Sequence, residues 1–150
     1  MMIQLEVREA EMKDAPALSE LSSQLGYEAS VREVELRLRA IMASPENQVL
    51  VACLEDGMVI GWIHVFIAHR IESGRFGELG GFVVAEDSRR RGIGTALLGA
   101  AEVWLTTHRI ERLRVRSRSG RGEAHAFFQR SGFSVTKDQR IFDKRIMIDT

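Results

Sequence analysis

The sequence predicts one mixed α/β (α+β) domain in which helices pack on a central sheet. Three observations carry this prediction. Segments that alternate with the two-residue period of strands are interleaved with segments whose apolar residues recur every three or four positions, as in amphipathic helices. Asp56-Gly57 separates two apolar runs, which is a strong hairpin signal. An apolar strand, Phe82 to Ala85, leads through a basic, glycine-containing loop into a helix.

The first half of the chain predicts a strand, two helices and a hairpin. Gly26 ends the first helix, and Ser30 with Glu33 forms a capping box for the second. The expected elements are a strand over residues 3–7, helices from Lys13 or Asp14 to residue 25 and from residue 31 to the stop at 44–47, and strands over 48–54 and from 58 to about 68.

The second half predicts the remaining strands and two more helices. Gly132 ends the last helix, because glycine readily adopts the left-handed conformation found after helix ends. The expected elements are a polar loop over 69–77, a strand over 78–84, a helix from 92 to about 107, a strand over 113–117, a helix over 123–131, and a strand pair over 133–137 and 140–148.

Length and composition indicate one ordinary globular domain spanning residues 1–150. The chain has 150 residues, of which 45% are hydrophobic and 28% charged. No apolar run approaches the ~18 residues of a membrane span, and the first residues lack the apolar core of a signal peptide. The single cysteine, Cys53, excludes an internal disulfide and favours a cytoplasmic location. No His/Cys spacing indicates a metal site, so we expect no metal.

Charge is balanced overall but differs between the halves. Residues 1–75 hold 7 Lys/Arg and 12 Asp/Glu, a balance of −5, whereas residues 76–150 hold 14 and 9, a balance of +5. One interpretation is a basic half that binds an anionic cofactor and an acidic half that receives a cation. The other is two differently charged solvated faces. Zero net charge argues against general nucleic-acid binding.

The stretch from Leu79 to Leu98 combines a strand, three consecutive arginines, the closely spaced Gly92 and Gly94, and a helix start. Unpaired amides at a helix N-terminus favour phosphate, and glycine permits close approach of a ligand. A nucleotide-hydrolase phosphate loop is excluded because no Lys follows Gly94, and a dinucleotide fingerprint starting at Gly92 would have Leu97 at its third glycine. A surface loop that only caps the helix is the alternative to a pyrophosphate site.

Two motifs in register resemble those of the Gcn5-related N-acetyltransferases. Arg89-x-x-Gly92-x-Gly94 after an apolar strand is similar to the coenzyme A pyrophosphate loop of that family. Ala124-x-x-Phe-Phe-x-x-x-Gly-Phe133 is similar to its later Ala-x-x-Phe-Tyr-x-x-x-Gly-Phe motif. The order β-α-α-β-β-β-α-β-α-β-β matches the family fold over essentially the full chain. The resemblance to these Gcn5-related N-acetyltransferases (GNAT) implies a mixed, mostly antiparallel central sheet. This sheet is splayed between its fourth and fifth strands and flanked by about four helices.

The resemblance implies acetyl-CoA as acyl donor, bound in the V between the strands at 78–84 and 113–117. Its pantetheine would pair with main chain of the first of these strands, and its pyrophosphate with amides from Arg90 to Ala96. Gly80-Gly81 inside a strand fits a bulge or a close backbone approach. The expected cofactor-binding residues are Phe82, Val83, Val84, Arg89, Arg90, Arg91, Gly92, Ile93, Gly94, Thr95, Ala96 and Phe128.

Acetyl transfer to an amine needs a group that removes a proton from the ammonium, whose pKa is ~10. Glu78 lies eleven positions before Arg89, similar to the catalytic glutamate of histone-modifying family members. A solvated strand-end glutamate is the alternative, and His64 and His69 are second choices as base. The family tyrosine that protonates the thiolate is replaced by Phe128, so the thiolate leaves unprotonated, takes a proton from water, or receives one from His125 or Ser117.

The acceptor is a small-molecule or peptide amine, which the sequence does not name. Specificity is expected from the loops at 24–30 and 69–77 and the hairpin at 137–140, with Tyr27, Glu28 and Glu33 receiving a cation and Trp62 lining the acceptor side. A homodimer is possible, and no nucleic-acid or membrane partner is expected. A non-catalytic acyl-CoA-binding module is the alternative function, because Phe128 has no proton to donate.

Overall fold

The computed structural model describes residues 4–89, 91–118 and 121–149. By its internal contacts the chain divides into two compact units, Met1–Arg116 and Ser117–Thr150. The two units are described separately below. The first unit contains the sheet and most of the predicted site, whereas the second contains the helix of the later motif.

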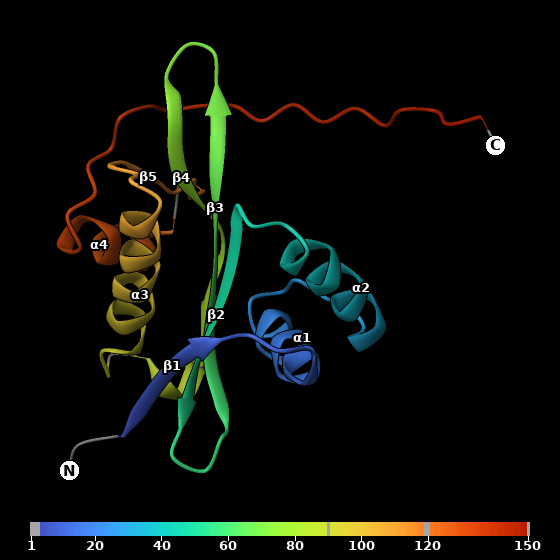
Figure 1. Ribbon diagram of the computed structural model, residues 1–150, viewed down its shortest axis with the longest axis vertical. Helices are drawn as coiled ribbons and strands as arrows, with labels where there is room; N and C mark the ends of the chain where they lie inside the picture. Colours follow the sequence, from blue (N-terminus) through green and yellow to red (C-terminus); the bar gives the residue numbers. More distant parts are fainter. Residues whose placement is uncertain (1–3, 90, 119–120, 150) are drawn as a thin grey trace. The chain divides into compact units, whose positions relative to one another are not determined.

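The first unit is built on a five-stranded sheet in the order β1-β2-β3-β4-β5 (Figure 1). Neighbouring strands are antiparallel from β1 to β4, and β5 runs parallel to β4. The predicted mostly antiparallel sheet is therefore confirmed. The strands are β1 (Leu5–Glu9), β2 (Asn47–Leu54), β3 (Val59–Arg70), β4 (Gly74–Val84) and β5 (Leu113–Arg114).

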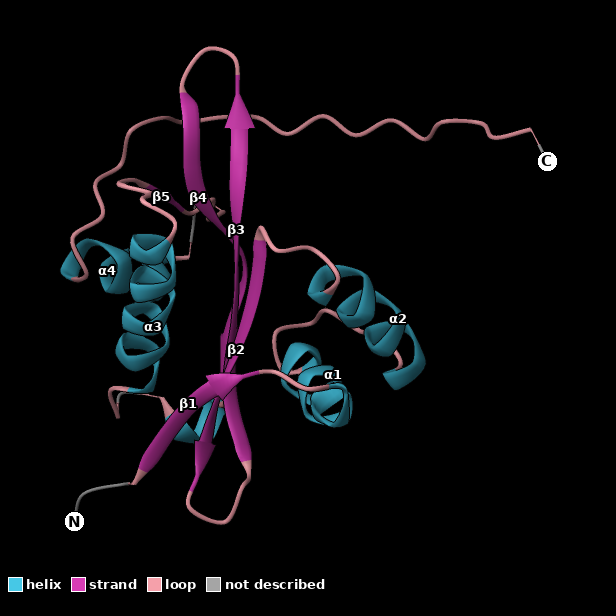
Figure 2. Ribbon diagram, in the orientation of Figure 1, coloured by secondary structure: helices cyan, strands magenta, loops and turns pink. Residues whose placement is uncertain are grey.

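Helices cover both faces of this sheet. Figure 2 shows α1 (Ala15–Ser23) and α2 (Val31–Met42) on one face and α3 (Ile93–Thr107) on the other. The predicted capping box starts α2: Ser30 Oγ accepts from the Glu33 amide at 3.1 Å, and the Glu33 carboxylate accepts from the Ser30 amide at 3.0 Å. Short 3₁₀ turns, η1 (Met12–Asp14) and η2 (Glu86–Ser88), precede α1 and the loop before α3.

Each face of the sheet has its own apolar core. On the α1/α2 face, buried side chains from both helices pack on β2, with Trp62 of β3 against them. On the α3 face, small residues let the helix approach: a Cβ at Gly61 would meet Leu97 at 3.1 Å, and one at Gly77 would meet Leu105 at 2.7 Å. The two faces of β3 and β4 thus serve different layers. The α1/α2 core consists of Ala10, Leu18, Leu38, Val49, Val51 and Cys53.

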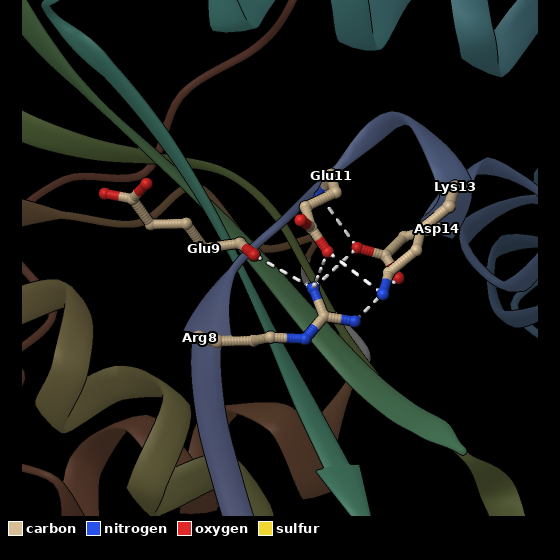
Figure 3. A network of polar contacts seen from close by, with 5 residues as sticks. All are labelled: Arg8, Glu9, Glu11, Lys13 and Asp14. Carbon is tan, nitrogen blue, oxygen red and sulfur yellow. Dashed lines mark hydrogen bonds and ion pairs between the residues drawn. The ribbon is translucent and has the colours of Figure 1, made fainter. Parts of the chain in front are cut away.

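The connection between β1 and α1 is held by a buried ion pair, shown in Figure 3. Two Arg8 nitrogens donate to the two carboxylate oxygens of Asp14 at 2.8 and 2.9 Å. The Glu11 amide also donates to Asp14 at 2.7 Å. Burial by itself raises the pKa of Asp14, but these hydrogen bonds outweigh it and hold the pKa below its usual value. The carboxylate is therefore ionised and fixes the first turn.

The predicted polar loop over 69–77 is wrong. β3 and β4 continue as one long hairpin, which pairs out to Arg70 and Gly74 around a three-residue turn. Gly74 has a positive φ of 78°, which suits the turn. Residues 69 to 75 are exposed on both faces of the hairpin, so neither face requires apolar side chains. The alternation of apolar and polar residues that predicts a strand is therefore weak here. The hairpin at Asp56-Gly57 is confirmed.

The expected strand over 113–117 is shorter than predicted. Only Leu113 and Arg114 pair with β4, opposite Gly77 and Glu78. The alternation of residues 113–117 specifies an extended chain, but a ladder requires a partner, and β4 and β5 no longer pair beyond Glu78. The splay that the resemblance implied between the fourth and fifth strands is thereby confirmed.

The second unit contains α4 (Gly122–Arg130) and the segment that follows it. Phe128 makes edge-on ring contacts with Phe127 and Phe133, at centroid distances of 5.6 and 5.4 Å. The expected strand pair over 133–137 and 140–148 is wrong: residues 133–149 form no strand (Figure 2). Their alternating sequence favours extended backbone, but strand formation also needs a hydrogen-bonded neighbour, and among the described residues none pairs with this segment.

Candidate active site

The edge of β4 beyond Glu78 is the centre of the candidate site. In the described part of the chain no strand pairs with this edge from Leu79 to Val84. Phe82 and Val84 are half-buried and Val83 is buried at 5% exposure. An extended ligand carrying amides can add to such an edge as a further strand.

The Gly80-Gly81 pair forms the predicted bulge. The β3–β4 register shifts between His64, which is opposite Gly81, and Val65, which is opposite Leu79, so Gly80 is the extra residue. A Cβ at Gly80 would come within 2.4 Å of His64 Nδ1, and one at Gly81 within 2.4 Å of Trp62 Cη2. Only glycines fit, because two ring systems lie directly against the bulged backbone.

Glu78 lies at the last β4–β5 pair, where the two strands separate. It is buried, at 9% exposure, and its Oε1 accepts a hydrogen bond from Arg116 Nε at 3.3 Å. The alternative interpretation of Glu78, a solvated glutamate at the strand end, is thus wrong. A buried carboxylate needs a partner, and the guanidinium supplies one while the second oxygen stays available as a hydrogen-bond acceptor.

Glu78 shares a face of the sheet with His64 and Trp62. Directly opposed residues of an antiparallel pair project to the same side, and Glu78 is opposite Phe66. Phe66, His64 and Trp62 alternate along β3, and Trp62 packs on the α1/α2 core. These four side chains therefore project to the α1/α2 face, and the acceptor-side role of Trp62 stays a prediction.

The loop after β4 leads to the start of α3. Gly92 caps this helix with a φ of 80°, and nothing lies within 4 Å of the position its Cβ would take. The first amides of a helix have no intrahelical acceptor, so those of Ile93, Gly94 and Thr95 are available to an anion. The Ala96 amide is not, because it donates to Gly92 O at 3.0 Å.

The structure describes two of the three arginines of this loop. Arg89 and Arg91 are exposed, and Arg89 Nε donates to Val84 O at 3.4 Å. Arg90, a predicted cofactor-binding residue, lies outside the described residues. The Ile93 side chain is buried at 2% exposure and anchors the helix start. Only the main chain of Ile93 can therefore take the predicted cofactor-binding role.

Two predicted site residues belong to the second unit. His125 lies in α4, where its amide donates to Arg121 O at 3.0 Å, and Phe128 lies one turn later in the phenylalanine cluster. Both side chains are half-buried. Their assigned roles as proton donor and acyl-chain contact stay predictions.

The expected cation-binding residues between α1 and α2 are only partly available. The Glu33 carboxylate is used by its capping box and by Arg37, at 3.4 Å. Tyr27 is 59% exposed. A shallow hollow of about 500 Å³ lies beside these residues, lined by Ser19, Glu20, Ser23, Glu28, Ala29, Ser30 and Glu33. Glu28 therefore lines an open acidic surface.

Sequence reasoning missed an acidic cavity at the carboxyl end of β4. It has a volume of about 630 Å³ and three carboxylates, and it is lined by Ala17, Glu20, Leu21, Gln24, Met58, Val59, Ala85, Glu86 and Asp87. The Glu86 amide donates to Gln24 Oε1 at 2.9 Å. The Glu86-Asp87 pair was the available signal, but its neighbours on α1 come together only in the fold.

Two further partners were not predicted, Arg116 for Glu78 and Asn47 for His64. Asn47 Oδ1 lies 2.8 Å from His64 Nε2. Both partners are distant in sequence, so no local pattern reveals them. Within the described ranges, no group of three His, Cys, Asp or Glu side chains is arranged to hold a metal ion. No helix of those ranges has the length and hydropathy needed to cross a membrane.

Comparison with known proteins identifies the family. Residues 7–133 match the family model described as the acetyltransferase (GNAT) family. The chain belongs to this family. The match includes the open β4 edge and the glycine loop in the first unit and α4 in the second. The protein is accordingly an acetyl-CoA-dependent N-acyltransferase, as the two sequence motifs predicted.

Relatives of this GNAT chain include aminoglycoside-modifying enzymes. It is 30% identical over 135 residues to an aminoglycoside N(6′)-acetyltransferase type 1 of Stenotrophomonas maltophilia, covering 87% of each protein. Its fold is similar to that of aminoglycoside 6′-N-acetyltransferase AAC(6′)-Ih of Acinetobacter baumannii, with a TM-score of 0.83, 19% identity, and 95% and 99% of the two chains covered.

Another similar fold belongs to an acetyltransferase of a different acceptor class. Glucosamine-6-phosphate N-acetyltransferase of Arabidopsis thaliana gives a TM-score of 0.80 at 19% identity, over 93% of this chain and 99% of that one. AAC(6′)-Iy in complex with CoA gives 0.87 at 19% identity, over 97% and 98%. These likenesses establish the fold of the chain.

Proposed function

We propose that this protein transfers the acetyl group of acetyl-CoA to a primary amine of a small molecule, by direct attack in a ternary complex. The observation that carries the proposal is the open β4 edge, which has a buried carboxylate at one end and a glycine-capped helix start at the other. An extended donor laid along this edge has its thioester near Glu78 and its phosphates near α3. The proposal treats residues 1–150 as one catalytic domain.

Acetyl-CoA binding is assigned to main-chain groups more than to side chains. The pantetheine amides pair with Phe82 to Val84, and the pyrophosphate accepts from the amides of Gly92 to Thr95. Charge-assisted hydrogen bonds of this kind are strong, and the open space at Gly92 admits the phosphate. Arg89 and Arg91 add positive charge at the rim. The fit requires no metal.

Glu78 is the carboxylate to which we assign the substrate ammonium. Its second oxygen is available while Arg116 holds the first. After the amine loses a proton, its nitrogen attacks the thioester carbon, the C–N bond forms, and the C–S bond breaks. A strand amide among Phe82 to Val84 stabilises the oxyanion of the intermediate. The thiolate takes its proton from water, His125 or Ser117.

Aminoglycosides are the first acceptors to test, because the relative at 30% identity bears that name. A protein amine is the less favoured acceptor. The buried single cysteine is consistent with a cytoplasmic enzyme, which we propose as its location. A homodimer stays a prediction that an oligomeric-state measurement would test.

The decisive experiment is thiol release from acetyl-CoA in the presence of a panel of aminoglycosides, polyamines and simple amines. We expect Glu78→Gln to lower kcat/KM for the amine about 10²-fold while leaving acetyl-CoA affinity unchanged. Glu72→Gln is the matched control, because this exposed residue lies at the hairpin turn. Equal turnover of wild-type protein and Glu78→Gln would remove Glu78 from the reaction.

A non-catalytic acyl-CoA-binding module is the second candidate, favoured by Phe128 in the tyrosine position. It predicts thermal stabilisation by acetyl-CoA with no turnover of any amine in the panel. Replacement of Phe128 by Tyr distinguishes the two candidates. In the enzyme, Phe128→Tyr changes the rate of an existing reaction, whereas in the binding module both proteins are inactive.

A further inference from the structure

His64 lies at the one position of β3 that faces the Gly80-Gly81 bulge. It is opposite Gly81 in the strand register, and its Nδ1 is 2.4 Å from the point a Gly80 Cβ would occupy. Gly80 is exposed, Gly81 and His64 are half-buried, and β4 and β5 have already separated at Glu78. The imidazole therefore lies against the bulged backbone next to the open edge.

One hydrogen bond fixes the tautomer of this imidazole. Asn47 Oδ1 is 2.8 Å from Nε2, and a carbonyl oxygen only accepts, so Nε2 carries the proton. Nδ1 then has a free lone pair on the edge of the ring next to Gly80. Among the described side chains that are not exposed, the one buried nitrogen or oxygen without a partner is Trp62 Nε1. His64 is half-buried, and its Nδ1 is not among these atoms.

The ring is also in the protonation state that a base requires. Burial lowers the pKa of His64 below its usual value, so the imidazole is neutral at pH 7. Its neighbours on β2 and β3 are uncharged: Asn47 on one side and the Phe66 ring at 5.6 Å on the other. On β4 the nearest titratable group is Glu78, opposite Phe66.

Glu78 and His64 occupy diagonal positions on the same face of the sheet. Side chains in this relationship are roughly 7–8 Å apart, enough for one substrate amine or one water between them. Glu78 accepts a hydrogen bond from Arg116 with one carboxylate oxygen. His64 has no cationic partner and a directed lone pair. The two groups therefore suit different tasks.

We propose that His64 is the general base of the acetyl transfer, accepting the amine proton at Nδ1 directly or through one water, while Glu78 holds the ammonium. One ammonium proton moves to Nδ1, and the neutral amine nitrogen bonds to the thioester carbon. As the C–S bond breaks, the second proton of this nitrogen passes to the leaving thiolate, directly or through water. The resulting imidazolium is stabilised by the Glu78 carboxylate and later returns its proton to solvent. Asn47 is a positioning residue that keeps Nδ1 unprotonated. This inference rests on the proposed amine acetylation.

The test is the pH dependence of kcat and kcat/KM with the best amine of the panel. We expect His64→Gln, which can still hydrogen-bond Asn47, to lower kcat about 10²–10³-fold with little change in the KM for acetyl-CoA. The acidic limb of the wild-type profile, with an apparent pKa below ~6.5, is expected to disappear. Glu78→Gln raises the KM for the amine and keeps that limb.

Two further variants separate catalysis from packing. In His64→Ala, added imidazole is expected to restore part of kcat, because the vacated space lies beside the bulge. Asn47→Ala is expected to lower kcat about tenfold and to be insensitive to imidazole. His108→Gln is the control histidine variant: this residue follows the C-terminal end of α3, where its Nδ1 lies 3.1 Å from Trp104 O, and the substitution is expected to leave kcat unchanged.

The outcomes distinguish this inference from the proposed function. If His64→Gln is folded, binds acetyl-CoA and keeps both kcat and the acidic limb, His64 is not the base, although the enzyme assignment stands. If wild-type protein binds acetyl-CoA but acetylates no amine, the proposed function fails first. Imidazole rescue of His64→Ala supports the inference, and absence of rescue together with a retained acidic limb in His64→Gln overturns it.

Discussion

At the scale of single residues, Asp14 is the side chain whose removal tests the tertiary structure most directly. It is 4% exposed and receives two hydrogen bonds from Arg8 and one from the Glu11 amide. Asp14→Ala removes the acceptor of Arg8 Nη2 and of the Glu11 amide, whereas Arg8 Nη1 keeps its bond to Glu9 O at 3.0 Å. We expect the free energy of unfolding to fall by about 2–4 kcal/mol, measured as a lower midpoint of urea unfolding at an unchanged slope.

Lys13→Ala is the matched control for this variant. Lys13 forms an ion pair with Glu11 at 3.2 Å, with side-chain exposures of 72% and 58%. Exposed pairs contribute ~0–1 kcal/mol, so the unfolding midpoint is expected to stay nearly constant. Equal losses from Asp14→Ala and Lys13→Ala would show that the Arg8–Asp14 pair is not a buried anchor.

The Asp14 carboxylate also makes the stability of the protein depend on pH. Hydrogen bonding holds the pKa of Asp14 below its ordinary value, so the unfolded chain takes up the proton first as pH falls. The stabilisation that the Asp14 carboxylate contributes is fully present above its pKa in the unfolded chain, ~3.9. It is lost as pH falls through its pKa in the folded protein. Urea unfolding between pH 6 and pH 3 is expected to show a smaller decline in Asp14→Asn than in wild type. An equal decline would contradict the assignment.

At the scale of elements, the bulge in β4 is a feature that glycine alone permits. Gly80→Ala forces a Cβ to within 2.4 Å of His64 Nδ1, and this ring cannot simply rotate away because Asn47 holds it. We expect a loss of about 1–3 kcal/mol in the free energy of unfolding and a fall in kcat. Gly99→Ala is the control: no atom lies within 4 Å of its Cβ position in α3, so it is expected to stabilise by about 0.5–1 kcal/mol.

The cap of α3 offers a second test at this scale. Gly92 and Gly57 both have open space around the Cβ position and positive φ angles, of 80° and 89°. Replacing either by Ala is expected to cost a similar amount, about 1 kcal/mol, in stability. Only Gly92→Ala is expected to raise the KM for acetyl-CoA, because its backbone lies at the phosphate-binding amides. A similar KM in both variants would argue against that location.

At the scale of the whole molecule, acetyl-CoA is expected to stabilise the protein by mass action. At a ligand concentration of 100 times Kd the gain is about 2.7 kcal/mol, which raises Tm by roughly 5–11 °C for a chain of this size. Thermal unfolding with and without acetyl-CoA measures this shift. The shift is expected to shrink at high ionic strength, because part of the binding is electrostatic. No shift at saturating ligand would refute the cofactor assignment.

The membership of the chain in the GNAT family could be recognised from local sequence. The capping box of α2, the hairpin at Asp56-Gly57 and the strand–glycine–helix order around Gly92 each depend on neighbours within a few positions. Hydrogen bonding and backbone sterics act over that same range, so the pattern predicts them. These signals also located Glu78 at the mouth of the splay.

The tertiary structure decided what these residues contact. Glu78 is a buried carboxylate that accepts a hydrogen bond from Arg116, and the His64 ring contacts Asn47. Both partners lie many residues away in the chain. The long β3–β4 hairpin and the short β5 were also beyond prediction, since strand length depends on the partner that completes the ladder. Sequence alone determined the family and the acyl donor. Long-range packing, which no local pattern encodes, determined which side chains contact Glu78 and His64.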